Sequence, residues 1–365
     1  MGIPHLNGFL KKYCASSIVD VALSTLSGKK IAIDISIYLY KFTAEKKLIE
    51  NIYLMLTSFS KYNITPVFIF DGKPPVEKYE VLKKRKEEKY SAESEYNRLK
   101  LEHYNMTIKR QFSSFTNDDN ERIDEDELSQ QLKDLELQMD KLKPQFIYIT
   151  KDIINEVKEL LRAYGATYFD SPSEADQLCA YLVIKNKTWA CMSDDMDMFA
   201  YGCDYIVRNF NVHNNTATVY SLNEILQHLN LSLKEFRQIC VLSGTDYGRY
   251  NSNMNLYKSL GLMKKYKQLN NDLNKQSFIE FVIEQQEAIN NRRKSYTGDK
   301  PEIIQDYECK KEENTRKAEV VQKLYNMFDL DHEMHQSKLK VFENVKVVNG
   351  KIMTDAIDKF IKKNI

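Results

Sequence analysis

Two short apolar runs that each end in an aspartate constrain the fold most strongly. Residues 29–36 and 65–72 are rich in β-branched residues and are bounded by polar residues or glycine, which is typical of strands. Asp34 follows the first apolar run, and Asp71 follows the second. Residues 44–62 between them have the pattern of an amphipathic helix. A strand, a helix and a second strand predict the start of a parallel α/β sheet.

The same alternation resumes after a long charged interval. Apolar residues from Ile153 to Leu161 recur at helical spacing, and Gly165 stands where that helix would end. Further strands are predicted near 166–169, 188–193 and 204–210, and further helices from 173, near 222–229 and near 232–242. The sequence therefore predicts an α/β fold with a central, mostly parallel, twisted sheet that is flanked by helices.

The charged interval itself predicts helices outside the core. Residues 73–89 are rich in lysine and arginine, whereas residues 118–127 are almost wholly acidic. Leucines from Leu128 to Leu142 form an imperfect helical stripe with too few apolar residues for a packed core. We expect a helical insertion that arches away from the sheet.

The composition indicates the cellular compartment of the protein and the classes of partner that it can bind. The net charge of +1 does not exclude a nucleic-acid partner, because the charge is unevenly spread. The six cysteines are scattered without a Cys-x-x-Cys pair, which favours free thiols in a reducing compartment. No apolar stretch is long enough to span a membrane. We expect an intracellular protein without a membrane partner.

Seven carboxylates occur in five short motifs, and three of these motifs place an acid where a strand would end. The residues are Asp34, Asp71, Glu174, Asp176, Asp195, Asp197 and Asp246. In an open α/β sheet, this edge is where ligands bind. Converging acids would repel one another unless cations held them, and oxygen ligands suit Mg²⁺ or Mn²⁺. The pattern predicts a metal-dependent phosphodiesterase.

Glu174 also has a plainer interpretation. Ser171 could be the N-cap of a helix, with Pro172 as its first residue and Glu174 as the acid of a capping box. Glu174 and Asp176 are two residues apart, so a regular helix would not point both at one spot. One of the two could therefore act through water.

The aspartates have plainer interpretations too. Asp34 and Asp71 could each cap the helix that follows, although an unpaired charge after an apolar strand would be costly. Asp195 and Asp197 would share one face if they stood at the end of a strand, and solvated loop acids are the alternative. Each motif is weak alone, and the ordered set is strong.

The ordered set resembles the flap endonuclease superfamily of structure-specific 5′ nucleases. The matching segments are Met1-Gly2-Ile3, Ile33 to Tyr40, Phe70 to Pro75, Pro172 to Asp176, Asp195-Met196-Asp197 and Gly244 to Tyr247. The resemblance runs from residue 1 to about residue 266. In that family these acids hold two divalent metal ions, which implies two Mg²⁺ ions, or Mn²⁺ in their place. Asp34, Asp71 and Asp176, with Glu174, would hold the first ion, and Asp195, Asp197 and Asp246 the second.

The resemblance also implies residues that contact DNA. Lys78 and Arg85 occupy the spacing of the family's basic helix, whose cations contact the scissile phosphate. Seven residues are two helical turns, so both side chains lie on one face. Tyr40 matches an aromatic residue on which the family stacks a base, and a core tyrosine is the alternative. The amino end at Gly2, once Met1 is removed, would lie beside the DNA junction.

The chain departs from the family in its arch between Lys78 and Glu174, which is longer than in the compact members, and at two further places. The interval from Asp34 to Asp71 is shorter than in cellular flap endonucleases, where that region supplies the pocket for a 3′ flap. The family has a helix-hairpin-helix turn that binds duplex phosphate and often K⁺. In this chain the usual glycines and basic residue of that turn are replaced by Asn253, Asn255 and Lys258. Asparagine tolerates a left-handed backbone, so the turn can survive and a K⁺ site is carried over.

We therefore divide the chain into five segments. Residues 1–77 and 144–249 are the two parts of the nuclease core, 78–143 the charged helical arch, 250–290 a degenerate helix-hairpin-helix region that binds duplex, and 291–365 a helical tail. The predicted function is two-metal hydrolysis of DNA phosphodiesters at 5′ flaps or junctions, in replication, repair or recombination. A 5′–3′ exonuclease on nicked duplex, a ribonuclease of the PIN type and a catalytically silent binder of DNA junctions are the alternatives.

The expected partner is branched or nicked double-stranded DNA. No peptide of the kind that binds a sliding clamp is recognisable near the C-terminus, and we expect a monomer. The expected location is the nucleus for a cellular protein, or a cytoplasmic replication site for a viral one.

Overall fold

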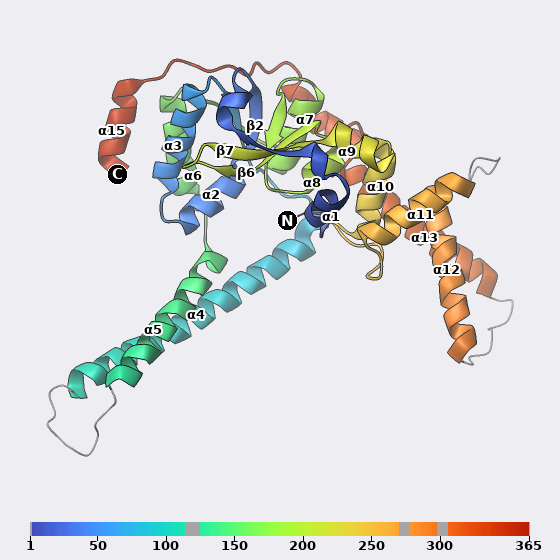
Figure 1. Ribbon diagram of the computed structural model, residues 1–365, viewed down its shortest axis with the longest axis horizontal. Coiled ribbons are helices and arrows are strands. Elements are labelled where there is room, and N and C mark those ends of the chain that lie inside the picture. Colours follow the sequence, from blue (N-terminus) through green and yellow to red (C-terminus); the bar gives the residue numbers. More distant parts are fainter. Residues whose placement is uncertain (1, 114–124, 270–276, 298–305, 365) are drawn as a thin grey trace.

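A seven-stranded sheet forms the centre of the part of the chain that the structure describes (Figure 1). The computed structural model describes residues 2–113, 125–269, 277–297 and 306–364. The strands, in the spatial order β1-β7-β6-β5-β2-β3-β4, are β1 (Ile18–Ala22), β7 (Thr216–Ser221), β6 (Tyr205–Asn211), β5 (Ala190–Met192), β2 (Lys30–Asp34), β3 (Thr65–Phe70) and β4 (Thr167–Asp170). The pairs among β6, β5, β2, β3 and β4 are parallel, so the predicted mostly parallel sheet is confirmed.

Two strands were not predicted. β1 and β7 pair with each other, and β7 also pairs with β6, in both cases antiparallel. β1 is short, and none of its five residues is fully buried. A strand of this kind lacks the continuous apolar run that identified β2 and β3.

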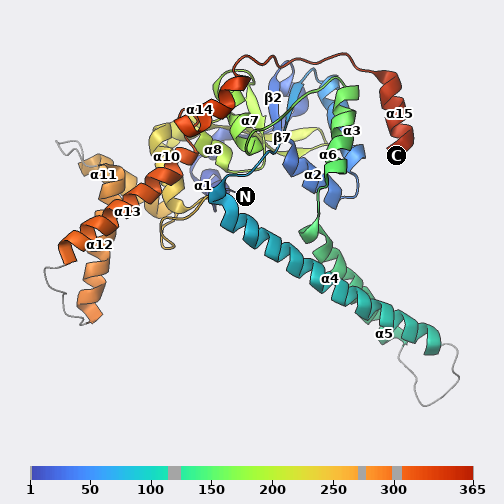
Figure 2. The same ribbon diagram turned by 180° about the vertical axis from the view of Figure 1, so that it is seen from behind.

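Helices cover both faces of the sheet and make two apolar cores. One face packs against α1 (Leu6–Tyr13), α7 (Ala175–Ile184), α8 (Asp197–Tyr201), α9 (Leu222–Leu229) and α10 (Leu233–Ser243). The other packs against α2 (Ile35–Ala44), α3 (Leu48–Lys61) and α6 (Lys151–Ala163). Side chains of one strand alternate between the cores: Ala32 lies in the first, and Ile31 and Ile33 lie in the second. The result is a three-layered α/β core (Figures 1 and 2).

The predicted helix 44–62 is wrong in its boundaries. The segment after β2 forms two helices, α2 and α3, and Lys46 between them has a left-handed backbone (φ 55°). The predicted strand 29–36 is also too long, because Asp34 already caps α2. Gly165 ends α6 with φ 68°, as its position in the sequence predicted.

The charged insertion forms a helical hairpin that projects from the core (Figures 1 and 2). α4 (Tyr79–Ser113) contains 35 residues, which corresponds to about 50 Å. α5 (Glu125–Leu142) packs along it through a small apolar cluster of Leu99, Leu135 and Met139. Residues 118–124 of the predicted acidic segment lie outside the described residues.

The C-terminal part is helical, as predicted, and it crosses back over the core. It comprises α11 (Leu256–Leu269), α12 (Phe278–Thr297), α13 (Asp306–Met327), α14 (Glu333–Leu339) and α15 (Thr354–Asn364). α15 lies against α6, where the backbone N–H of Met353 donates to the carbonyl of Ala163 (2.8 Å). None of the described helices is both long and apolar enough to cross a membrane. Cys14, Cys179, Cys191, Cys203 and Cys240 are buried and free of disulfides, as predicted.

Candidate metal centre

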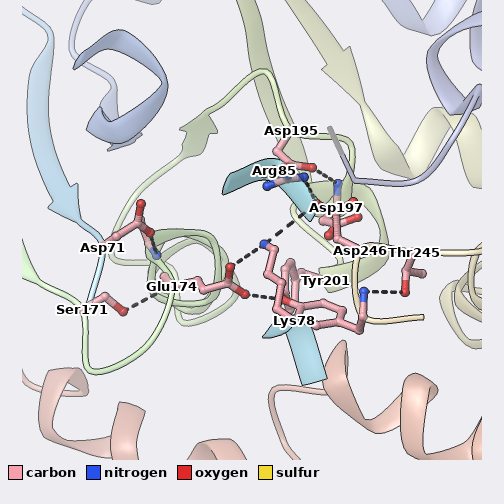
Figure 3. Close-up of polar contacts among 12 residues, drawn as sticks. Asp71, Lys78, Arg85, Ser171, Glu174, Asp195, Asp197, Tyr201, Thr245 and Asp246 are labelled. Atoms are coloured by element: carbon pink, nitrogen blue, oxygen red, sulfur yellow. Dashed lines mark hydrogen bonds and ion pairs between the residues drawn. The ribbon is translucent and has the colours of Figure 1, made fainter. Parts of the chain in front are cut away.

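All seven predicted carboxylates lie at one edge of the sheet, where β2, β3 and β5 end. Figure 3 labels five of them: Asp71, Glu174, Asp195, Asp197 and Asp246. Asp34 is the last residue of β2, and Asp71 follows β3. Glu174 and Asp176 stand at the start of α7 beyond β4, and Asp195 and Asp197 follow β5, while Asp246 follows α10. Because the parallel strands point the same way, their carboxyl ends deliver these acids to one place.

Asp34 has two functions at once. Its Oδ1 accepts the backbone N–H of Ser36 (3.1 Å) and so caps α2, while its Oδ2 accepts the hydroxyl of Ser193 (3.2 Å). Burial and the nearby charges of Asp71 and Asp195 raise the pKa of Asp34 to about 8. The capping interpretation is therefore correct, and it does not remove Asp34 from the cluster.

The capping-box interpretation of Glu174 is wrong. α7 begins at Ala175, and the N–H of Ala175 is capped by Asp71 (Oδ1, 2.8 Å), which comes from a different strand. Ser171 instead donates its hydroxyl to the carbonyl of Glu174 (2.9 Å). Glu174 is the N-cap residue with an extended backbone, so its side chain is not bound by helical geometry. This is how Glu174 and Asp176 reach the same site.

Asp195 and Asp197 lie in a turn rather than at the end of a strand. β5 ends at Met192, and Asp197 is the first residue of α8. The Oδ1 of Asp195 accepts the N–H of Asp197 (3.0 Å), which holds the two together. This hydrogen bond within the turn makes Asp195 and Asp197 face the same site. The predicted alternation of side chains along a strand is not the cause.

The chemistry of the cluster fits divalent cations. The Oδ1 atoms of Asp176 and Asp197 are buried and have no hydrogen-bond partner among the described residues. Burial, followed by the charges of neighbouring acids, among them Asp195, raises the pKa of both carboxyls well above the ordinary value. Buried, mutually repelling carboxylate oxygens are stabilised by an ion such as Mg²⁺.

Two cations of the protein already occupy part of this cluster. Lys78, just before α4, donates to Glu174, and Arg85 in α4 donates to Asp246 (2.6 Å). Burial alone lowers the pKa of Lys78. The negative charges of Glu174 and Asp176 raise this pKa by more than burial lowers it, so the net shift is upward and the ammonium stays charged. Among the described residues no three acidic, histidine or cysteine side chains form a ready metal-ligand group. The ion pairs hold Glu174 against Lys78 and Asp246 against Arg85.

A buried pair of tyrosines supports Glu174, and the sequence analysis did not identify it. The hydroxyl of Tyr247 donates to Oε2 of Glu174 (2.8 Å) and lies 2.7 Å from the hydroxyl of Tyr201. The ring of Phe328 packs against both tyrosines, with centroids at 5.1 and 5.4 Å. Burial raises the pKa of Tyr247 and of Tyr201, so both remain protonated donors. The only signal in the sequence was that Tyr247 adjoins Asp246.

Gly2 lies against the second group of acids. A side-chain carbon at this position would stand 2.1 Å from Oδ1 of Asp195 and 2.5 Å from Oδ1 of Asp197. The backbone also has φ 77°, which side chains disfavour. The resemblance placed Gly2 beside the DNA junction, and the structure places it beside the carboxylates.

Tyr40 stands on α2 and is not a core residue, since 44% of it is exposed. The ammonium of Lys89 in α4 lies 4.7 Å from the centre of its ring and 5.5 Å from that of Tyr148. A base that stacked on this face of Tyr40 would have to displace Lys89.

Asn253, Asn255 and Lys258 lie in a separate pocket of about 400 Å³. Neither asparagine has the left-handed backbone that we expected, because both are absent from the positive-φ residues of the described chain. Asn255 instead caps α11 by accepting the N–H of Lys258 (3.0 Å). Lys258 donates its ammonium to the carbonyl of Asn253 (2.7 Å). Side-chain and backbone hydrogen bonds therefore hold these three residues together at the start of α11.

Comparisons with protein families agree with this architecture. Residues 1–92 match the XPG N-terminal domain, and residues 165–246 match the XPG I-region. The chain is 30% identical over 304 residues to a probable RAD2-like endonuclease, 369L, of Invertebrate iridescent virus 6, a match that covers 73% of this chain and 70% of that protein. It is 29% identical to flap endonuclease 1 of Theileria annulata, covering 74% of this chain but only about half (51%) of that longer protein.

Solved structures share the fold. The catalytic core of Rad2 in complex with a DNA substrate has a TM-score of 0.58 at 22% identity, covering 100% of this chain and 95% of that one. Human GEN1 in complex with Holliday junction DNA has a TM-score of 0.56 at 16% identity, covering 99% and 73%. Together with the family matches, the ordered carboxylates on this sheet show that the chain belongs to the flap endonuclease and XPG superfamily.

Proposed function

We propose that the chain is a structure-specific 5′ nuclease that hydrolyses DNA phosphodiesters at 5′ flaps or junctions. The observation that carries this proposal is the convergence of seven carboxylates with two cations, Lys78 and Arg85, at the foot of the α4–α5 hairpin. Acids of this kind bind divalent ions, and cations beside them attract a phosphate. Relatives named as flap endonucleases and a RAD2-like endonuclease support the same activity.

The residues divide into metal ligands and phosphate ligands. We assign Asp34, Asp71, Glu174 and Asp176 to one Mg²⁺ and Asp195, Asp197 and Asp246 to the other, with Mn²⁺ as a substitute. When bound, the two ions would generate a hydroxide and stabilise the charge on the phosphate. A structure of the Holliday junction-resolving enzyme GEN1 with product DNA and a Mg²⁺ ion supports this choice of metal.

In this proposal, Lys78 and Arg85 leave their carboxylate partners and bind a phosphate when DNA binds. In the structure each is paired with a carboxylate of the site, and 37% of the Arg85 side chain is still exposed. A phosphate that entered beside them would be held by charge-assisted hydrogen bonds and oriented for in-line attack. Tyr40 would stack the adjacent base after Lys89 moves from its ring.

The partner we propose is branched or nicked double-stranded DNA, bound by a monomer. Asn253, Asn255 and Lys258 would contact the duplex arm. We retain the K⁺ ion at this turn as part of the proposal, although its backbone differs from the one expected. The proposed location is intracellular.

Cleavage of labelled DNA tests this function. Purified protein with Mg²⁺ is expected to cut a 5′-flap duplex near the junction and to leave a 5′-phosphate and a 3′-hydroxyl. A matched RNA flap, a nicked duplex and a four-way junction separate the ribonuclease, exonuclease and junction-resolving alternatives. Binding of all the DNA substrates without any cut strand would instead favour the silent binder and overturn the proposal.

Tyr247→Phe is expected to weaken metal binding and cleavage together. The phenylalanine keeps the ring against Phe328 but loses the donor to Glu174, and loss of such a supporting hydrogen bond reduces metal affinity or activity about 10- to 100-fold. Mn²⁺ titration by electron paramagnetic resonance and cleavage rates measure the effect. Tyr201→Phe is the matched control, because it leaves the Tyr247–Glu174 bond in place. An equal loss in both variants, or no loss in Tyr247→Phe, would show that the bond from Tyr247 to Glu174 has no special part in metal binding.

A further inference from the structure

Two segments of the chain combine positive charge with a complete lack of acids. Residues 2–19 contain Lys11 and Lys12, and residues 247–269 contain Arg249, Lys258, Lys264, Lys265 and Lys267, but neither segment contains an aspartate or a glutamate. By contrast, the whole chain has 52 acidic residues among 365. The two segments pack together where the ring of Phe9 in α1 meets that of Tyr257 in α11, with centroids 5.4 Å apart.

Lys12 is held at the centre of this contact by two aromatic rings. Its ammonium lies 5.5 Å from the centre of the Tyr13 ring and 5.2 Å from that of Tyr257. The two rings are 6.0 Å apart and tilted by 55°, so they do not form parallel plates for a base. Both tyrosines are more than 40% exposed, and Lys12 is exposed as well. The rings therefore orient a cation at the surface, and its complement is an anion.

The position of Lys12 relative to the carboxylates suggests which anion this is. Gly2 lies against Asp195 and Asp197, and α1 then runs for eight residues, or about 12 Å, to Tyr13. At about 3.4 Å per nucleotide of one strand, this length corresponds to three or four phosphates. The pocket of about 400 Å³ that contains Asn253 and Lys258 is also lined by Tyr257. Lys12 therefore adjoins the surface of this pocket through its contact with Tyr257.

We propose that Lys12, oriented by Tyr13 and Tyr257, binds a backbone phosphate of the duplex arm a few nucleotides from the cleaved bond. This proposal rests on the proposed function and adds a contact outside the carboxylate centre. The ligand is the phosphodiester of DNA, and the contact carries no sequence preference. Its value to the enzyme is to fix the register of the duplex while Lys78 and Arg85 hold the reacting phosphate.

Lys12→Ala tests the contact through the salt dependence of binding. With Ca²⁺ in place of Mg²⁺, so that a 5′-flap duplex is bound, loss of one phosphate contact should reduce the slope of log K against log salt by about 0.9. The same relation predicts an affinity loss of about eightfold at 0.1 M salt and about twofold at 0.5 M. Lys61→Ala is the matched control, because Lys61 also lies over a tyrosine ring (Tyr62, 5.3 Å) but at the opposite edge of the sheet. An unchanged slope in Lys12→Ala overturns the proposal.

A neutral-backbone scan locates the phosphate. Single methylphosphonate substitutions along the duplex arm should weaken binding of the parent protein at one or two adjacent positions, and these positions should have no further effect on Lys12→Ala. Fully additive losses would show that Lys12 contacts no phosphate there. A parent protein that cuts no flap would refute the proposed function, whereas normal cutting with additive losses would refute only this contact.

The tyrosines supply a second, independent readout. Tyr13→Ala with Tyr257→Ala should lower affinity roughly two- to fivefold, the size of an exposed cation–π contact, and should leave the salt slope nearly intact because Lys12 remains charged. Tyr13→Phe with Tyr257→Phe should retain the parent affinity, since the rings are kept. A loss of affinity in the phenylalanine variant would overturn the assigned role of the rings.

Discussion

Asp197→Asn is expected to abolish DNA cleavage and, at the same time, to raise the thermal stability of the metal-free protein. The Oδ1 of Asp197 is buried without a partner, and burial together with the charges of Asp195 and Asp246 raises its pKa. A neutral amide removes this repulsion, and each 1 kcal/mol that is removed should raise Tm by about 2–4 °C. Loss of a metal ligand should reduce the cleavage rate by at least about 100-fold. Calorimetry with and without Mg²⁺, beside single-turnover cleavage, measures both effects.

The raised pKa of Asp34 predicts how the stability of the metal-free protein changes with pH. The pKa of Asp34 is about 8 in the folded protein and near 4 when unfolded, so the folded state binds more protons between these values. The stability of the metal-free protein should therefore fall as the pH rises from about 4 to about 8, and Mg²⁺ should remove most of this loss. Asp194→Asn is the control in the same loop, because Asp194 is not one of the seven carboxylates and its Oδ1 accepts the N–H of Asn209 (2.8 Å). Equal Tm shifts in Asp197→Asn and Asp194→Asn would contradict the repulsion argument.

Lys78→Ala and Arg85→Ala are expected to change cleavage and metal affinity in opposite directions. Both residues hold carboxylates of the site in the DNA-free structure, so their removal frees Glu174 and Asp246 for metal. Mn²⁺ should bind more tightly to the DNA-free variants than to the parent. The same variants lack the cations that orient the phosphate, and a lost electrostatic contact of this kind costs about 10²–10³ in rate.

Lys84→Ala separates these effects from a general loss of charge. Lys84 lies on the same helix as Arg85 with 77% of its side chain exposed, and it pairs with the solvated Glu88 (3.8 Å). It should change neither the Mn²⁺ affinity nor the rate by more than about twofold. If Lys78→Ala and Arg85→Ala bind Mn²⁺ no more tightly than Lys84→Ala, the ion pairs do not compete with metal.

The sequence predicted the elements that local patterns define. Strands β2 and β3 and the acids that follow them could be identified because buried apolar runs and strand ends are local features. The same applies to α6, whose apolar stripe and terminal glycine lie within fifteen residues. By contrast, β1 and β7 pair between residues about 200 positions apart, and none of the residues of β1 is fully buried. No local pattern marks such a pair.

The partners of the site residues could not be predicted for the same reason. The cap on Ala175 comes from Asp71, 104 residues earlier, so the nearby serine was a reasonable but wrong candidate. The bond between Tyr247 and Glu174 spans 73 residues. Sequence reasoning identified which acids converge, but only the tertiary structure shows which donors orient them.

Phe328 has a practical consequence for where the functional unit ends. The matches to the two XPG domains stop at residue 246, yet the ring of Phe328, just after α13, packs against Tyr201 and Tyr247. A shortened protein that retained every carboxylate but ended before α13 would leave the hydroxyl relay to Glu174 open to water. Fragments made for crystallisation or binding assays should therefore extend past residue 330, although no acid of the centre lies beyond residue 246.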